Sequence, residues 1–214
     1  MYLSRVEIDT NNRQKISALQ HLGAYHNWVE QSFPEEIKEQ KRLRHLWRID
    51  ALNGKLYLLV LSEEKPDLEK LEAYGVKKSA MTKDYDAFLN KLQEGQVLRF
   101  RLTANPTRKI SRPGHKQGRV VPHVTIDKQK EWFLQKATKN GFEVVSDPSG
   151  LNFNIVDRDW KLLRHKGNQN ARLSCVTYEG ILKISDLKAF KNALVNGIGR
   201  EKAYGMGLLT VIPR

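Results

Sequence analysis

The sequence predicts an α+β protein made of two tandem ferredoxin-like (RRM-like) βαββαβ domains, residues 1–94 and 95–214. Alternating apolar and polar residues predict strands, and apolar residues at steps of three and four predict helices. The two kinds of segment follow one another twice in the order β-α-β-β-α-β. A length of 214 residues also suits two small domains.

The first half has a local signal for each element. Pro34 ends a long helical pattern, and an Asn-Gly pair between two strand-like stretches is typical of a hairpin. In chain order we expect a strand at Tyr2–Asp9, a helix at Arg13–Phe33, strands at Leu43–Ile49 and Lys55–Leu61, a helix at Asp67–Tyr74 and a strand at Val76–Ala80.

The second half repeats this order, with Gly141 and Gly197 ending its two helices. Its first strand is followed by a basic stretch with Pro and Gly, from Asn105 to His123. In chain order we expect a strand at Val97–Leu102, a helix at Lys128–Asn140, strands at Phe142–Val145, Phe153–Val156, Trp160–Arg164 and Arg172–Tyr178, a helix at Asp186–Asn196 and a strand at Leu208–Ile212.

The surplus of positive charge lies entirely in the second half. Residues 1–94 hold 15 basic and 15 acidic residues, whereas residues 95–214 hold 22 basic and 9 acidic ones, which is the whole net charge of +13. Clustered Lys and Arg favour a polyanionic partner, and their interleaving with Pro, Gly and His favours nucleic acid over a membrane surface. A basic surface without a partner is the plainer alternative.

Two segments concentrate these cations, and we predict that both bind RNA. One segment contains no acid and holds Arg99, Arg101, Arg108, Lys109, Arg112, Lys116 and Arg119. The other is a polar turn flanked by Arg164, Lys166 and Arg172. Closely spaced cations of this kind suit a phosphate backbone, although a solvated hairpin explains the second segment equally well.

A glycine-rich loop is the most specific local feature. Gly197, Gly199, Gly205 and Gly207 surround Arg200 and Lys202, between the last helix and the last strand. Glycine lets backbone N–H groups approach a phosphate closely, and the two cations add charge. The loop follows a helix, which excludes a dinucleotide-binding fingerprint, and no Gly-Lys-Ser/Thr sequence is present. An ordinary glycine turn is an equal alternative.

Other features exclude whole classes of protein. The single cysteine, Cys175, excludes a disulfide framework and a cysteine-rich zinc site. None of the six histidines has the spacing of a helical metal site, and no apolar run approaches the ~20 residues of a membrane span. We therefore expect a cytoplasmic protein with no metal, no other cofactor and no membrane partner.

His26 is the main candidate for acid–base chemistry. It lies on the apolar face of its predicted helix beside Leu22 and Val29, and Tyr25 supplies a neighbouring hydroxyl. Imidazole is the usual general acid or base at neutral pH. A partly buried structural histidine is the ordinary alternative.

Four segments spread over the chain form a pattern typical of one family. They are the opening MYLSRVEI, His26 seven residues before Phe33-Pro34, RFRLTANPTRK (Arg99–Lys109) and the closing GIGREKAYGMGLLTVIP (Gly197–Pro213). In these segments the chain resembles the CasE endoribonucleases of type I-E CRISPR systems. The resemblance implies two ferredoxin-like domains that cut the stem-loop repeats of precursor CRISPR RNA without metal. It also implies that the product is retained together with the other subunits of the Cascade complex.

The resemblance implies that His26 is the catalytic residue. CasE relatives often carry a tyrosine three residues before this histidine, where this chain has Gly23. Either Tyr25 substitutes for it, or the phenol is not essential, or the match moves to His21. The implied reaction is attack of a ribose 2′-OH on the adjacent phosphate, with His26 as base or acid, to give 2′,3′-cyclic phosphate and 5′-OH ends.

Two other functions stay open at this point. A non-catalytic RNA-binding subunit of a ribonucleoprotein complex would need the same folds and the same basic surface. A nucleotide-binding metabolic enzyme has less support, because no acidic ribose or metal partner accompanies the glycine-rich loop.

Overall fold

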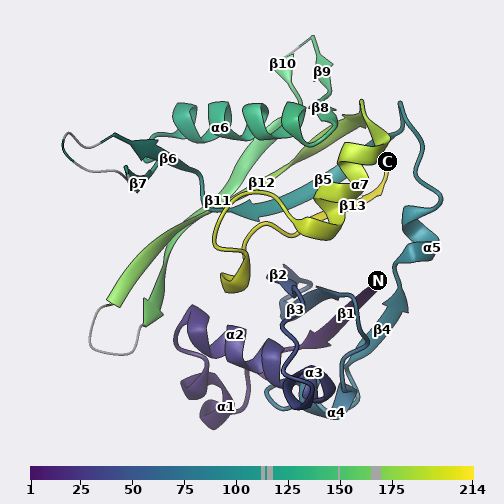
Figure 1. Cartoon of the computed structure of the whole chain (residues 1–214), viewed down its shortest axis with the longest axis vertical. Coiled ribbons are helices and arrows are strands. Elements are labelled where there is room, and N and C mark those ends of the chain that lie inside the picture. The colour runs from purple at the N-terminus through teal and green to yellow at the C-terminus, as the bar shows by residue number, and fades with distance from the viewer. Residues whose placement is uncertain (112–113, 115–117, 149, 165–169) are drawn as a thin grey trace.

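Two antiparallel sheets with flanking helices form the framework of the chain, one built from each half (Figure 1). The computed structural model describes residues 1–111, 114, 118–148, 150–164 and 170–214. Arg112, Lys116 and Lys166, predicted to bind RNA, lie outside the described residues.

The first sheet has the strand order β2-β3-β1-β4, and all neighbouring strands are antiparallel. Its strands are β1 (Tyr2–Glu7), β2 (Leu46–Leu52), β3 (Lys55–Ser62) and β4 (Met81–Asp84). The helices of this half are α1 (Arg13–Ala18), α2 (Leu22–Gln31), α3 (Pro34–Lys38), α4 (Leu68–Leu71) and α5 (Asp86–Leu89).

The second sheet has the order β11-β12-β5-β13, with β8 also paired to β12. Its strands are β5 (Val97–Ala104), β8 (Phe142–Val144), β11 (Phe153–Arg164), β12 (Asn170–Ile184) and β13 (Leu209–Pro213). The helices of this half are α6 (Ile126–Lys139), α7 (Leu187–Asn196) and the short 3₁₀ helix η1 (Lys202–Tyr204). Two small hairpins are separate from the sheet: β6 (Thr107–Ile110) with β7 (Arg119–Pro122), and β9 (Ser146–Asp147) with β10 (Gly150–Leu151).

Both sheets therefore have the ferredoxin-like strand order, in which the first strand of each half lies between the third and the fourth. This confirms the fold class predicted from the order of elements. The boundary between residues 94 and 95 stays a prediction. Among the residues that the structure describes, no helix is long and apolar enough to cross a membrane.

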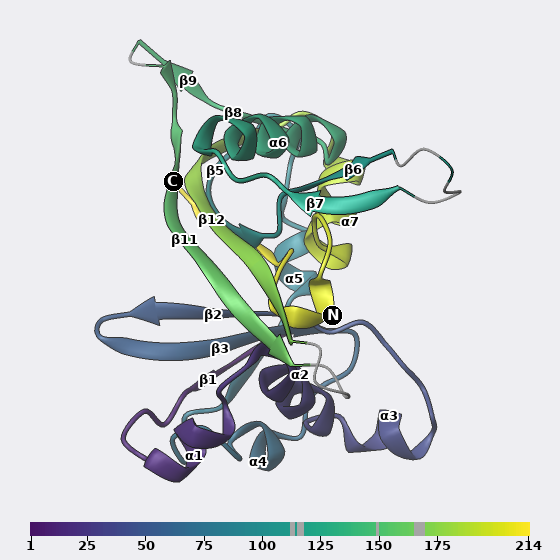
Figure 2. The same ribbon diagram turned by 90° about the vertical axis from the view of Figure 1, so that its left-hand side faces the viewer.

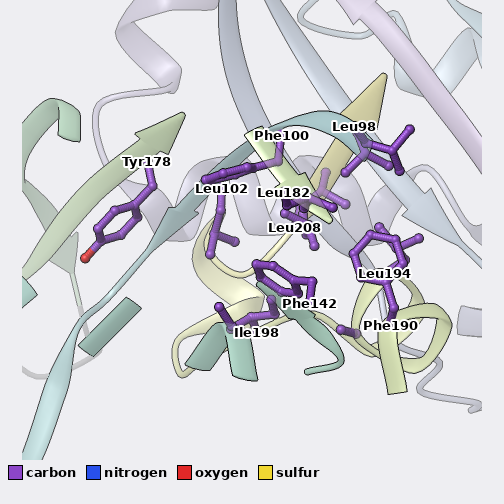
Figure 3. Packing of buried hydrophobic residues seen from close by; sticks show 14 of the residues in the cluster. Leu98, Phe100, Leu102, Phe142, Tyr178, Leu182, Phe190, Leu194, Ile198 and Leu208 are labelled. Carbon is purple, nitrogen blue, oxygen red and sulfur yellow. The ribbon is translucent and has the colours of Figure 1, made fainter. Parts of the chain in front are cut away.

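Side chains from β5, β12 and α7 build the core of the second half. Figure 3 shows Leu98, Phe100 and Leu102 of β5 together with Phe142 and Phe190, all of them buried. The Phe100 and Phe133 rings stack at a centroid distance of 5.2 Å. This core supports the strand that also carries Arg99 and Arg101.

A second core belongs to both halves of the chain. It combines Trp28, Val29 and Trp47 of the first half with Leu163, Cys175 and Met206 of the second. Because these side chains are buried against each other, the end of the β11–β12 hairpin and the glycine-rich loop lie against the first sheet and α2 (Figure 2).

Arg48 joins the two sheets directly. Its side chain is 2% exposed, and Nη1 donates hydrogen bonds to the carbonyl oxygens of Arg101 (2.9 Å) and Leu208 (2.8 Å). Nη2 donates to Thr210 Oγ1 and to Asp50, both at 2.7 Å. A buried guanidinium with this many partners fixes β2 relative to β5 and β13.

The single helix predicted at Arg13–Phe33 is wrong. α1 already ends at Ala18, and the extended backbone of His21 (φ −149°, ψ 158°) separates it from α2, which begins at Leu22. Pro34 does more than end a helix, because it is the first residue of α3. Within α2, His26 lies beside the buried Leu22 and Val29, but its own side chain is 31% exposed.

Two strand predictions were misplaced. The fourth strand is Met81–Asp84 and not Val76–Ala80, because Lys78 takes a left-handed φ of 62° and Ser79 closes a turn on Val76. Phe153–Val156 and Trp160–Arg164 are parts of one 12-residue strand, β11, with a bulge between Ile155 and Asp157. A bulge keeps the pairing going while it bends the ribbon.

Candidate active site

A cavity of about 440 Å³ opens beside His26 where the two halves of the chain meet. It is lined by His26, Glu30, Arg42, Leu43, Arg44, His45, Lys202, Ala203 and Tyr204. Residues from α2, from the segment leading into β2 and from the glycine-rich loop therefore surround the same space. The cavity is large enough to hold part of a nucleotide.

His26 has contacts on two sides. Its Nδ1 lies 3.8 Å from Glu30 Oε1, one helical turn further along α2. The ring of Tyr204 faces it edge-on at a centroid distance of 5.6 Å. Tyr204 is a phenol that sequence reasoning missed, because it is distant in sequence from the histidine.

A buried histidine lies next to this pair. His45 Nδ1 is 2.9 Å from Glu30 Oε1, and Nε2 is 3.1 Å from Glu36 Oε1. The His45 ring stacks on Phe33 at 3.9 Å with an interplanar angle of 8°. Burial by itself lowers the pKa of His45, but its hydrogen bonds to the two carboxylates outweigh burial and raise the pKa.

Three cations reach the cavity: Arg42, Arg44 and Lys202. Lys202 Nζ donates to the Asn196 carbonyl at the end of α7 (2.7 Å), and Arg44 Nη1 lies 3.5 Å from the same oxygen. Burial lowers the pKa of Lys202, and the charges of Arg44 and Lys136 lower it further. Arg42 and Arg44 were missed because they belong to the half of the sequence whose net charge is zero.

The glycines of the loop serve packing within the protein. At Gly205 (φ +78°) a Cβ would lie 2.6 Å from the Trp47 ring, and at Gly197 (φ +71°) it would lie 2.9 Å from Leu46. At Gly207 (φ +90°) it would lie 2.8 Å from the Ile198 carbonyl oxygen. Three of the four predicted glycines are thus required by close contacts inside the protein.

Gly199 differs, because it lines a second, smaller cavity of about 220 Å³. That cavity is lined by Thr107, Arg108, Lys109, Val120, Trp132, Lys136, Gly199 and Arg200. It brings three cations predicted from the sequence together with Lys136, which was not predicted. No acidic residue among those that the structure describes lines it, so its charge suits an anion.

The other predicted RNA contacts are dispersed. Arg164 and Arg172 are exposed near the end of the β11–β12 hairpin, which reaches α2 (Figures 1 and 2), and Arg119 is exposed on β7. Arg101 instead forms ion pairs with Asp50 (3.2 Å) and Glu179. With Arg99 it lines a third cavity, of about 710 Å³, which does not include His26.

Tyr25 and His21 do not line the cavity of His26. They lie with Lys161 around another pocket, of about 200 Å³, and Tyr25 stacks on Trp47 at 5.9 Å. Burial raises the pKa of Tyr25, an effect that Lys161 opposes. A Cβ at Gly23 would lie 3.1 Å from His21 Nδ1, so the His21 ring covers the position from which a side chain at residue 23 would project.

Among the residues that the structure describes, no group of three or more His, Cys, Asp or Glu side chains is arranged to hold a metal ion.

The fold and the site together define a class of protein suited to binding nucleic acid. It has tandem ferredoxin-like folds, a cavity that contains a histidine, and a second cavity lined by cations. Residues 1–213 match the family described as CRISPR associated protein, and the chain belongs to this family. This confirms the family resemblance predicted from the sequence motifs.

Two curated relatives and two solved structures define the similarity further. The chain is 27% identical to the CRISPR-associated endoribonuclease Cse3 of Thermus thermophilus over the full length of both. It is 31% identical over 131 residues to the CRISPR system Cascade subunit CasE of Escherichia coli, which spans 57% of this chain and 61% of that one.

A structure of Cse3 bound to 19 nt RNA superposes with a TM-score of 0.83 at 25% identity and full coverage of both chains. The crystal structure of Cas6e from Escherichia coli K-12 gives a TM-score of 0.63 at 23% identity, also over both full chains, which supports the fold.

Proposed function

We propose that this protein is an endoribonuclease that binds the stem-loop repeats of precursor CRISPR RNA and cuts them without a metal ion. Its family supports this, as does its full-length similarity to a protein named as a CRISPR-associated endoribonuclease. The observation that carries the proposal is the placement of His26 in a cavity with three cations.

The reaction we propose is transesterification within the RNA. The ribose 2′-OH loses its proton and attacks the adjacent phosphorus, and the bond to the 5′ oxygen breaks as that oxygen gains a proton. The products carry a 2′,3′-cyclic phosphate and a 5′-OH. His26 serves as the base or the acid, which is worth about 10²–10⁴-fold in rate.

The cations have a distinct part in this proposal. Lys202, Arg42 and Arg44 stabilise the charge that develops on the scissile phosphate. Arg108, Lys109 and Arg200 hold a neighbouring phosphate in the smaller cavity. Because Arg101 is engaged by two carboxylates, we leave it out of the proposed RNA surface.

The two halves divide these tasks. Residues 1–94 supply His26 together with Arg42 and Arg44, whereas residues 95–214 carry the whole surplus of positive charge. We further propose that the product stays bound and enters a Cascade complex, as the name of the CasE relative suggests.

Two proteins, the wild type and His26→Ala, and two RNAs, the repeat and its 2′-deoxy form, test the proposal. The wild type should cut repeat RNA in the presence of chelator, whereas His26→Ala should bind it with unchanged affinity and fail to cut. An RNA with 2′-deoxyribose 5′ to the cut should bind and stay intact, because the nucleophile is missing. Cleavage by His26→Ala at the wild-type rate would refute the assignment.

If wild-type protein binds repeat RNA tightly and never cuts it, the alternative function gains support. The protein is then a non-catalytic RNA-binding subunit of a ribonucleoprotein complex. Mapping the ends of the RNA after incubation with the protein separates the two functions directly.

A further inference from the structure

Glu30 Oε1 is shared by two histidines at the edge of the candidate active site. It lies 2.9 Å from His45 Nδ1 and 3.8 Å from His26 Nδ1. The second nitrogen of His45 faces another carboxylate, Glu36 Oε1, at 3.1 Å. His26 is thus connected through Glu30 to a buried cluster that the proposed reaction does not otherwise use.

The cluster has a defined charge. An ionised carboxylate only accepts hydrogen bonds, so two of them can be satisfied by one imidazole only when both of its nitrogens carry protons. Burial raises the pKa of Glu30, but the hydrogen bond and charge of His45, with the charges of His26 and Arg42, outweigh burial and lower the pKa, in agreement with an ionised carboxylate there. One imidazolium between two ionised carboxylates has a net charge of −1. Of the two carboxylates, Glu30 is the one that faces His26.

Burying this charged cluster has a cost in stability. His45 and Glu36 side chains are only 2% and 4% exposed. Removing charges from water is costly, and replacing a buried ion pair by apolar residues is often neutral or stabilising. We therefore look for the role of the cluster in how it fixes the position of the Glu30 carboxylate.

We propose that Glu30 is a positioning residue for His26, and that His45 and Glu36 hold Glu30 in place for this purpose. The inference rests on the proposed function, in which His26 takes or gives a proton. A carboxylate at Nδ1 favours the tautomer that carries its proton there and leaves Nε2 to exchange a proton with the RNA. When Nε2 gains the 2′-OH proton, Glu30 stabilises the imidazolium that results.

Other charged groups have the opposite electrostatic effect on His26. Arg42, Arg44 and Lys202 line the same cavity, and Tyr204 covers one edge of the ring. These cations disfavour a protonated imidazole, whereas Glu30 favours it. The carboxylate therefore balances the charge that the site needs to bind phosphate.

The first test replaces the charge and keeps the shape of the side chain. Glu30→Gln should slow single-turnover cleavage of repeat RNA by about 10–100-fold, within what one acid or base contributes. The limb of the pH–rate profile that reports His26 should move to lower pH, because the lost carboxylate no longer favours the imidazolium. RNA affinity should stay equal or rise, because a negative charge is lost near the phosphate.

Glu35→Gln is the matched control. Glu35 lies on α3, its side chain is 65% exposed and it pairs only with Lys38 among the partners the structure describes. This variant should leave both the rate and the pH profile unchanged.

Nitrogen-15 NMR of the imidazoles gives a readout that does not depend on activity. In the wild type, neutral His26 should carry its proton on Nδ1, and Glu30→Gln should shift the tautomer toward Nε2–H. An unchanged tautomer together with an unchanged pH profile overturns the inference. Wild-type cleavage by His26→Ala overturns the proposed function instead.

A second variant tests the role of His45. His45→Leu combined with Glu36→Gln removes one positive and one negative charge, so the net charge beside His26 stays at −1. We expect a smaller loss of cleavage, about 3–10-fold, because Glu30 keeps its charge and loses its anchor. Wild-type cleavage and an unaltered His26 tautomer in this variant would show that His45 does not position Glu30.

Discussion

Gly205→Ala tests whether the glycine-rich loop is seated on Trp47. Gly205 has a φ of +78°, and a Cβ there would lie 2.6–3.0 Å from three atoms of the Trp47 ring. A left-handed φ costs alanine about 1–2 kcal/mol. The forced shift of a buried ring adds about 1–3 kcal/mol. We therefore expect the free energy of unfolding to fall by about 2–5 kcal/mol.

Gly54→Ala is the matched control for this substitution. Gly54 has nearly the same φ, +75°, but no atom lies within 4 Å of the position of its Cβ. It should lose only the backbone cost of about 1–2 kcal/mol. Denaturant unfolding of both variants isolates the contact with Trp47.

A double variant provides the decisive comparison. With Trp47→Leu present, the additional cost of Gly205→Ala should fall to that of Gly54→Ala, since the ring that blocks the Cβ is gone. Equal losses for the two glycine variants, or an unchanged cost in the Trp47→Leu background, would refute the packing of the loop. Cleavage should fall more in Gly205→Ala than in Gly54→Ala, because the loop carries Lys202 and Tyr204 into the cavity.

Three further predictions concern charge and burial. Arg108→Ala should reduce the slope of log K against log salt for RNA binding by about 0.7–0.9. The control is Lys55→Ala, which should leave the slope unchanged because Lys55 pairs with Glu7. Equal slopes for both variants would place Arg108 away from the RNA. The pKa of His45 is raised in the folded state, so its contribution to the free energy of unfolding is present below pH ~6.5 and is lost as the pH rises through the raised value. Wild type should accordingly lose more stability between pH 6 and 9 than the His45→Leu/Glu36→Gln variant, and parallel curves would contradict this. Burial raises the pKa of the Cys175 thiol to about 12, so iodoacetamide should modify it only after unfolding, as mass spectrometry can measure; rapid labelling of native protein would contradict its burial.

The sequence was sufficient for the order of the strands and helices that build the two sheets, because each half alternates strand and helix signals that depend only on nearby residues. It did not predict α3, α5 or the two small hairpins. Asn53-Gly54 predicted its hairpin correctly, since both residues take positive φ values in the turn between β2 and β3. The break between α1 and α2 was not predicted, because no proline marks it and the apolar residues Leu19 and Leu22 on its two sides belong to one buried core.

For a similar reason, only part of the candidate site could be predicted from the sequence. His26 stood out by its spacing to Phe33-Pro34, and Lys202 by its glycine-rich surroundings. Glu30, Arg44 and His45 carry no motif, and they reach the cavity only because α2 and β2 meet there. Which residues line a junction of two sheets is decided by tertiary packing, which local patterns do not encode.

The dependence of the glycine-rich loop on β2 has a consequence for exchanging parts between relatives. Trp47 donates a hydrogen bond to the Ala203 carbonyl at 2.9 Å, and Arg48 holds the backbone of β5 and β13 from the other half. In a chimera that joins residues 1–94 of one relative to the second half of another, these contacts would therefore form only if β2 and the glycine-rich loop came from the same relative. Trp47 and Ala203 are 156 positions apart in the sequence. Compatibility between relatives should therefore depend on two distant segments together, and transferring Leu46–Leu52 should restore cleavage to a mismatched chimera.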